Sequence, residues 1–118
     1  GETETRQGSI MITVTENALN FIRHSAESGA IEAEMGLRVA IKEAGDGGYD
    51  YGIGFDEERE KDLEFDFDGV KIFINEELRE YLEDATLDYV ELEDGSMSLI
   101  VLNPNDPTYI PPTKKKKQ

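Results

Sequence analysis

The stretch over residues 36–55 constrains the fold of this chain more than any other part of the sequence. Leu37, Val39 and Ile41 alternate with Arg38, Ala40 and Lys42, and apolar residues return at every second position from 49 to 55. Alternation with this period is typical of strands that bury one face and expose the other. The sequence therefore predicts two strands that follow one another closely.

Between these two strands lies a short polar segment, residues 43–48, with the sequence EAGDGG. Three glycines and an aspartate are suited to a tight and adaptable turn, so the two strands are predicted to form a β-hairpin. Loop tips carried by a rigid scaffold often hold binding residues. The candidate interaction loop is therefore the tip of this hairpin, formed by Gly45, Asp46, Gly47 and Gly48.

Charge excludes one large class of partner. The chain has 27 acidic and 12 basic residues and a formal net charge of −15, and four of the bases lie together at positions 114–117. Nucleic-acid-binding surfaces need Lys and Arg to contact phosphates, so no nucleic-acid partner is expected. The longest apolar run, around residues 99–102, is far too short to span a membrane. No secretory signal is visible, and the cytoplasm is the expected location.

The chain contains no cysteine, which removes several kinds of chemistry at once. Disulfides, cysteine nucleophiles and iron–sulfur ligation by the protein's own thiols are all excluded. The glycine-rich loop is followed by neither Lys-Ser nor Lys-Thr, so it is not a phosphate-binding P-loop. With one histidine, His24, no catalytic triad is apparent. Catalytic residues, a resident metal and a cofactor are therefore not predicted, and the chain is expected not to be an enzyme.

The remaining hydrophobic pattern completes the fold prediction. A strand over 11–14 leads to Thr15, which is placed to cap a helix that ends near Gly29. Further strands are predicted over 63–67, 70–74, 87–92 and 97–102, with a short helix over 76–83. Strands outnumber helices and hairpins join most neighbours. The expected fold is β-rich α+β, a compact pseudo-barrel or sandwich of mostly antiparallel strands with two flanking helices.

At 118 residues the chain is expected to form one domain. The domain is predicted to run over residues 11–109. Residues 1–9 are polar, and residues 1–10 are expected to be an unstructured or non-native lead, whereas residues 110–118 are expected to form a flexible, Lys-rich C-terminal tail.

Several short motifs, in this order, resemble the A-type iron–sulfur carriers of the HesB/IscA family. They extend from residue 11 to residue 106, and no single one is specific. They are MITVT at 11–15, GLRV at 36–39, GVKI at 69–72, TLDYV at 86–90 and NPN at 103–105. The resemblance implies the β-rich fold with two flanking helices described above.

In that family, one cysteine in the glycine loop and two in a Cys-Gly-Cys tail bind iron or a [2Fe–2S] cluster. Here Asp46 stands at the loop position, and Ile110 and Pro112 lie near the two tail positions. All three thiolates are therefore missing. The sequence resembles a cysteine-less branch of the family, similar to DsrR, which is encoded with sulfur-oxidation proteins.

This resemblance implies a non-enzymatic scaffold that acts through protein contacts in iron–sulfur or sulfur metabolism. The expected partner is a client protein with a basic patch, attracted by the acidic surface and the Asp46 loop. The alternative is an iron carrier that uses carboxylates at the loop, where Glu43, Asp46 and Asp50 lie close in sequence. An uncharacterised enzyme is a third possibility. The sequence leaves open whether the protein is a monomer or a dimer.

Overall fold

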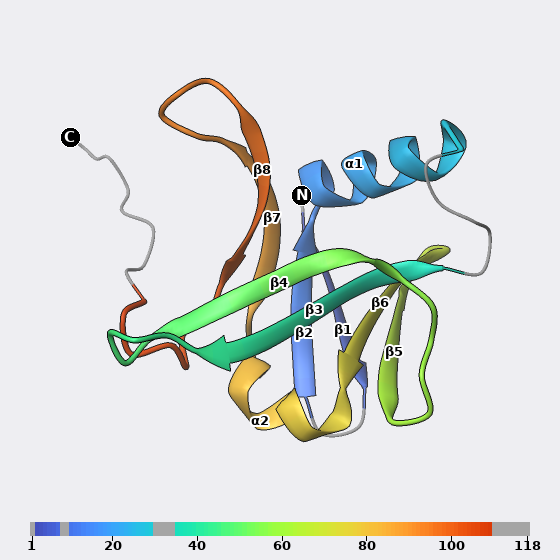
Figure 1. The fold of residues 1–118 in the computed structure, drawn as a ribbon. Coiled ribbons are helices and arrows are strands. Elements are labelled where there is room, and N and C mark those ends of the chain that lie inside the picture. The colour runs from blue at the N-terminus through green and yellow to red at the C-terminus, as the bar shows by residue number, and fades with distance from the viewer. Residues whose placement is uncertain (1, 8–9, 30–34, 110–118) are drawn as a thin grey trace.

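The computed structural model describes residues 2–7, 10–29 and 35–109, with side chains described from Met11 onward (Figure 1). From β2 onward, its strands and helices follow one another in the order predicted. They are β1 (Glu2–Gln7), β2 (Ile10–Thr15), α1 (Glu16–Glu27), β3 (Gly36–Glu43), β4 (Tyr49–Asp56), β5 (Asp62–Phe67), β6 (Val70–Asn75), the 3₁₀ turn η1 (Glu76–Leu78), α2 (Arg79–Leu82), β7 (Thr86–Glu91) and β8 (Met97–Leu102).

The strands form two four-stranded sheets, one in the order β1-β2-β7-β8 and the other in the order β4-β3-β6-β5. Each sheet consists of two antiparallel pairs joined by one parallel pairing, β2 with β7 and β3 with β6. The predicted β-rich α+β fold with mostly antiparallel strands and two helices is therefore confirmed, with two separate sheets rather than a closed barrel (Figure 1).

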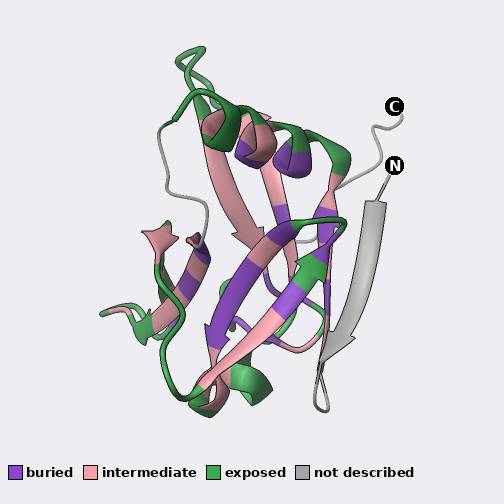
Figure 2. Ribbon diagram, turned by 90° about the vertical axis from the view of Figure 1, so that its right-hand side faces the viewer, coloured by how far each residue is buried: buried purple, intermediate pink, exposed green. Residues whose placement is uncertain are grey.

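The core lies between the two sheets and under α1, where the strands turn their buried faces toward each other (Figure 2). Alternation along the strands places the large side chains there, as the sequence pattern predicted. The most deeply buried core side chains, each no more than 2% exposed, are Val14, Ala18, Leu19, Leu37, Phe65, Phe67, Ile72, Ile74 and Leu82.

The two helices begin as their sequences indicate. The Thr15 hydroxyl caps α1 by accepting a hydrogen bond from the Ala18 N–H at 3.2 Å, which satisfies a backbone donor that has no partner within the helix. The Asn75 side chain accepts a hydrogen bond of 2.9 Å from the Glu77 N–H and so caps the 3₁₀ turn η1, which leads into α2. His24 is exposed in the last turn of α1. No described helix is long and apolar enough to cross a membrane.

Strand β1 corrects the expectation that residues 1–10 form an unstructured lead. Glu2–Gln7 pairs antiparallel with β2 over its whole length, from Glu2 opposite Thr15 to Gln7 opposite Ile10. The segment has no apolar residue, so it lacks the hydrophobic alternation that identifies a strand. Backbone pairing to β2, which sequence periodicity does not reveal, defines this element.

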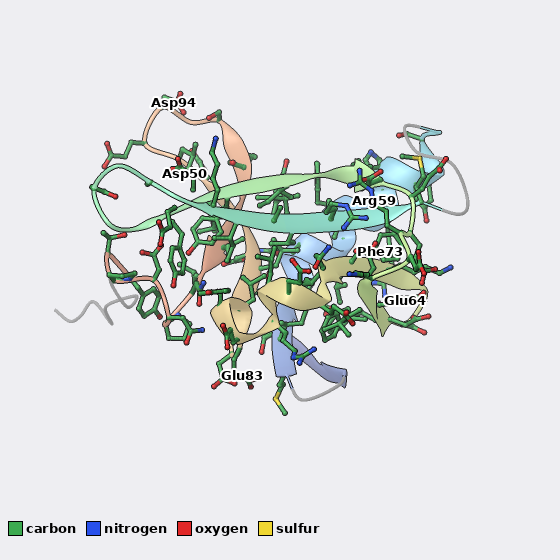
Figure 3. The ribbon with its side chains drawn as sticks, turned by 60° about the horizontal axis from the view of Figure 1, so that its bottom comes forward. Asp50, Arg59, Glu64, Phe73, Glu83 and Asp94 are labelled. Atoms are coloured by element: carbon green, nitrogen blue, oxygen red, sulfur yellow. The ribbon has the colours of Figure 1, made fainter. Side chains whose placement is uncertain are left out.

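An ion-pair network lies on the outer face of the sheet β4-β3-β6-β5. Arg38 on β3 donates two hydrogen bonds to Asp62, of 2.8 and 2.6 Å, and one of 2.7 Å to Asp56. The Asp62 side chain is fully buried and that of Arg38 is 14% exposed. The guanidinium also lies 5.9 Å from the ring centre of Phe73, within cation–π range. The network fixes the β4–β5 connection at the end of the sheet far from the glycine loop (Figure 3).

Candidate functional site

The predicted interaction loop joins β3 to β4 as a closed turn. The Ala44 N–H donates to the Gly48 carbonyl at 2.8 Å, and the Asp46 carboxylate accepts a hydrogen bond of 2.9 Å from the Gly48 N–H. Gly47 has a φ of +88°, a conformation that glycine adopts without strain. Gly45, Asp46 and Gly47 are exposed, whereas Gly48 is buried. The loop therefore presents Asp46 to solvent and turns Gly48 toward the protein.

Gly48 is buried by residues 103–109, which we call the C-terminal segment. A Cβ atom built at Gly48 would lie 2.6 Å from Thr108 Oγ1 and 3.1 Å from Asp106 Oδ1. Only glycine leaves room for the Thr108 and Asp106 side chains so close to the loop backbone. The loop and the C-terminal segment therefore lie side by side (Figure 1). Tyr51, just after the loop, bonds to Asp106, which is 55 residues further along the chain. This junction is the candidate functional site.

Asp106 is the central residue of the junction. Its Oδ2 accepts a hydrogen bond of 2.7 Å from the Tyr51 hydroxyl on β4. Its Oδ1 accepts bonds from the Thr108 N–H, at 2.9 Å, and the Thr108 hydroxyl, at 2.8 Å. With these bonds a single carboxylate, 9% exposed, joins sheet β4-β3-β6-β5 to the C-terminal segment.

These contacts also determine the protonation states of Asp106 and Tyr51. Burial by itself would raise the pKa of Asp106, but the hydrogen bonds from Thr108 and Tyr51 outweigh it and hold that pKa below the ordinary carboxyl value. Burial, followed by the bond to Asp106, raises the pKa of Tyr51 well above that of a free tyrosine. Near neutral pH the carboxylate is therefore charged and the phenol is a permanent donor.

Asn103 attaches the other end of the C-terminal segment. Its side chain is 1% exposed and its Nδ2 donates to the Tyr81 carbonyl at 2.7 Å. Its Oδ1 accepts the Asn105 N–H at 3.0 Å, and Asn105 in turn donates to the Glu83 carbonyl at 2.8 Å. The Asn-Pro-Asn motif thus binds the C-terminal segment to the end of α2.

Three tyrosine rings pack beside this attachment. Tyr49 meets Tyr51 edge to face, with ring centres 6.3 Å apart, and meets Tyr81 in the same way at 6.2 Å. Such contacts are favourable and specific in geometry. They connect β4 to α2 directly, so hairpin, helix and C-terminal segment form one assembly.

Sequence reasoning identified the loop but missed the residues that surround it. Tyr51 and Asp106 were not predicted as a pair, because no local pattern connects residues so distant in the chain. The sequence Asp106-Pro107-Thr108 is a turn signal that could have indicated the local bonds. Ile110 and Pro112, which lie near the family's tail cysteine positions, are outside the described residues, as is the whole predicted tail over 110–118.

The donor set at the junction does not fit an iron–sulfur cluster as cargo. The chain has no thiol, Asp46 Oδ1 accepts a hydrogen bond from Gly48, and both carboxylate oxygens of Asp106 accept hydrogen bonds within the protein. Within residues 10–29 and 35–109, no group of three His, Asp or Glu side chains is placed to hold a metal ion. The described part of the junction is suited to contact rather than ligation.

Substitution of Gly48 tests the close contact. A Gly48→Ala variant should lose about 1–3 kcal/mol of the free energy of unfolding, because its Cβ overlaps Thr108 and something must shift. Gly45→Ala is the matched control, since nothing lies within 4 Å of its Cβ. Adding Thr108→Ala to Gly48→Ala should recover part of the loss. Urea denaturation of the parent, Gly48→Ala, Thr108→Ala and the double variant gives the coupling, and an additive double variant would contradict the contact.

Comparisons with known proteins identify the family of the chain. The family model described as iron-sulphur cluster biosynthesis matches residues 10–106. An uncharacterised protein of Bradyrhizobium diazoefficiens is 38% identical over 99 residues, covering 83% of this chain and 92% of that protein. The iron-sulfur cluster insertion protein ErpA of Marinobacter nauticus is 37% identical, covering 77% of this chain and 82% of its own.

A solved structure shows the same fold. SufA of Escherichia coli, described as involved in the biosynthesis of iron–sulfur clusters, superposes with a TM-score of 0.66 at 26% identity, covering 79% of this chain and 80% of SufA. The resemblance seen in the sequence is confirmed by the family match and by the fold. The chain belongs to the iron–sulfur cluster biosynthesis family, the HesB/IscA family of A-type carriers, and within it has no cysteine.

Proposed function

We propose that the protein is a non-enzymatic A-type scaffold that acts by protein–protein contact in iron–sulfur or sulfur metabolism, like the cysteine-less DsrR branch, in the cytoplasm. One observation carries the proposal. The loop and the C-terminal segment still meet, but Asp46 accepts a hydrogen bond from Gly48 of its own loop, and Asp106 accepts hydrogen bonds from Tyr51 and Thr108. The scaffold is retained while the means of holding a cluster is lost, so a surviving role is recognition.

The proposed interaction loop is Gly45 to Gly48, and its proposed partner is a client protein with a basic patch. Asp46 is exposed at the tip, and Glu43 and Asp50 are exposed on either side of it. A cluster of one charge sign accelerates encounter with an oppositely charged surface and selects among partners.

Iron transport by carboxylates, the alternative, has less support. The nearest acids to the loop in sequence are exposed, and the two carboxylates at the junction already accept hydrogen bonds from the protein. Metal content separates the two functions. Protein incubated with ferrous iron and desalted should hold no stoichiometric iron if contact is the function, and a full equivalent of bound iron would support the alternative.

Salt dependence tests the proposed contact. A client captured on the immobilised protein and then purified should associate more slowly as ionic strength rises, since exposed charges are screened beyond about 8–10 Å at physiological salt. An Asp46→Lys variant should slow association by about tenfold, and Asp46→Asn, which retains the acceptor for Gly48, by less. Surface plasmon resonance measures both rates.

Glu58→Lys is the matched control because it makes the same charge change on an exposed residue of the β4–β5 connection, away from the loop. It should slow association much less than Asp46→Lys. Equal effects of the two lysines would indicate general charge attraction, and a client insensitive to salt and to Asp46 would refute the proposed site.

A further inference from the structure

An aspartate is followed directly by a glycine at three places in the chain, Asp46-Gly47, Asp68-Gly69 and Asp94-Gly95. A glycine after aspartate leaves the backbone nitrogen between them accessible to the aspartate side chain, because glycine has no Cβ to obstruct it. All three steps are exposed, and each lies in a turn between two consecutive strands. The three turns differ in how firmly they hold the N–H group of the glycine.

In two of the turns the glycine N–H makes a hydrogen bond of ordinary length. The Gly69 N–H donates to Asp66 Oδ1 at 2.8 Å, and the Gly95 N–H donates to the Leu92 carbonyl at 2.9 Å. Both distances are typical of N–H···O bonds in proteins. A nitrogen held in this way must first give up its hydrogen bond before it can lose its proton and react, so these two steps are protected.

The Gly47 N–H, in the interaction loop, is held less firmly. It donates to the Ala44 carbonyl at 3.3 Å, which is longer than the usual range of about 2.7–3.2 Å. A Cβ built at Gly47 would meet nothing within 4 Å, so the space around this peptide bond is open. The Asp46 Oδ1 accepts the Gly48 N–H at 2.9 Å, and this bond turns the carboxyl group back toward the backbone that follows it. Of the three glycine nitrogens, that of Gly47 is therefore the least protected.

The carboxyl groups of the other two steps have competing partners. Asp94 Oδ1 accepts hydrogen bonds from the Ser96 hydroxyl at 2.7 Å and from the Ser96 N–H at 3.0 Å. These bonds lower the pKa of Asp94 below the ordinary carboxyl value, and attack by a backbone nitrogen needs the protonated carboxyl group. The Asp68 carboxylate lies 3.6 Å from the guanidinium of Arg23, with which it forms an ion pair to α1. Reaction is therefore disfavoured on the carboxyl side at these steps as well.

We propose that Asp46-Gly47 is a modification site, at which the tip of the interaction loop rearranges to isoaspartate. The Gly47 nitrogen gives up its proton and bonds to Asp46 Cγ, while the carboxyl hydroxyl leaves with that proton as water and a succinimide ring closes. Water then adds to the backbone carbonyl carbon of Asp46, whose bond to the Gly47 nitrogen breaks, and the chain continues through Cγ. One water is released and one is consumed, nothing is oxidised or reduced, and the mass of the protein is unchanged.

The rearrangement alters the geometry of the loop. The main chain gains one methylene group between Asp46 and Gly47, and the free carboxylate is then carried by Asp46 Cα. The Ala44 N–H and the Gly48 carbonyl close the unmodified loop at 2.8 Å, and a longer main chain does not fit the same closure. Isoaspartate is the substrate of carboxyl methyltransferases that use S-adenosylmethionine, so the product identifies a class of enzyme that would act on this loop. The proposal does not depend on the function proposed for the loop.

Peptide mapping of the full chain tests the proposal. The folded protein is incubated for several weeks near neutral pH, digested, and analysed by electron-transfer mass spectrometry, which distinguishes isoaspartate from aspartate of the same mass. Isoaspartate at Asp46 should accumulate about three- to tenfold faster than at Asp68 or Asp94, which is the difference expected from one hydrogen bond of ordinary strength. The same chain unfolded in guanidinium chloride is the internal control. There the turns are lost, and the three rates should converge.

Asp46→Glu is the matched variant, because it retains a carboxylate at the exposed tip but would have to close a larger ring. Methyl transfer from labelled S-adenosylmethionine by a purified isoaspartyl methyltransferase should rise with incubation time in the parent. In Asp46→Glu it should fall to the level of the two remaining Asp-Gly steps. Equal rates at the three steps of the folded chain, or a faster reaction at Asp68 or Asp94, would overturn the proposal. Isoaspartate that forms at Asp46 in the unfolded chain but not in the folded one would overturn it as well.

Discussion

An Arg38→Met variant should lose about 3 kcal/mol of the free energy of unfolding. This is the low end of the cost of removing one partner from a buried ion pair, because the Asp56 side of the network is open to solvent. The fully buried Asp62 carboxylate would keep its charge without the guanidinium that now forms two hydrogen bonds with it. Urea denaturation measures the loss.

Arg59→Met is the matched control for that measurement. Arg59 also pairs with Asp56, at 2.8 Å, but its side chain is 68% exposed. Exposed ion pairs contribute little, so this variant should remain within about 1 kcal/mol of the parent. Equal losses from the two variants would show that burial of Asp62 does not determine the effect.

The same network predicts a pH dependence. Hydrogen bonds from Arg38 lower the pKa of Asp62 and that of Asp56 below the ordinary carboxyl value. A carboxyl whose pKa is lower in the folded state stabilises the fold above its unfolded pKa, about 4, and this stabilisation is lost as pH falls through the lower folded value. The stability difference between the parent and Arg38→Met should therefore shrink below about pH 4. Protonation of the many other acids relieves repulsion in both proteins, so the difference isolates the network.

An Asn103→Ala variant should lose about 2 kcal/mol of the free energy of unfolding, because the Tyr81 carbonyl and the Asn105 N–H would lose their partner at a nearly fully buried position. The loss should be accompanied by faster hydrogen exchange at Asp106, Thr108 and Tyr109, whose amides bond within the C-terminal segment. Hydrogen exchange measured by NMR or mass spectrometry shows directly whether the C-terminal segment has detached from α2.

Asn105→Ala provides the comparison for Asn103. Asn105 is exposed and donates to the Glu83 carbonyl from the surface, where water can replace it. It should lose less than about 1 kcal/mol and leave exchange at Asp106 nearly unchanged. A variant at 105 as damaging as the variant at 103 would mean that the surface bond, rather than the buried one, holds the segment.

The features of this fold that could be predicted are those that follow from patterns between residues close in sequence. Leu37, Val39 and Ile41 face the core because alternation and burial have the same period, and Thr15 caps α1 because its hydroxyl reaches a nearby amide. The Gly45–Gly48 tip was predictable as a turn for the same reason. Strand β1 was missed because its sequence lacks hydrophobic alternation, although its backbone pairs with β2 along its whole length.

The rest of the candidate site depends on contacts between distant residues. Nothing near Asp106 in the sequence indicates Tyr51, and nothing near Gly48 indicates Thr108. The resemblance to a known family placed the loop and the Asn-Pro-Asn motif, but it could not show that Asp106 would bond to β4. Only the fold brings these groups together, and their chemistry became apparent from the distances.

The parallel pairings within the two sheets bear on how the chain folds during synthesis. Thr15 of β2 and Asp88 of β7 are 73 residues apart, and they are hydrogen-bonded across the two neighbouring strands. Contacts so distant form late and slowly because a long loop must close first. While a ribosome is still making the second half, β2 has no β7 beside it and its apolar face has no completed core. A nascent chain that stalls before Thr86 would therefore leave β2 without its β7 neighbour.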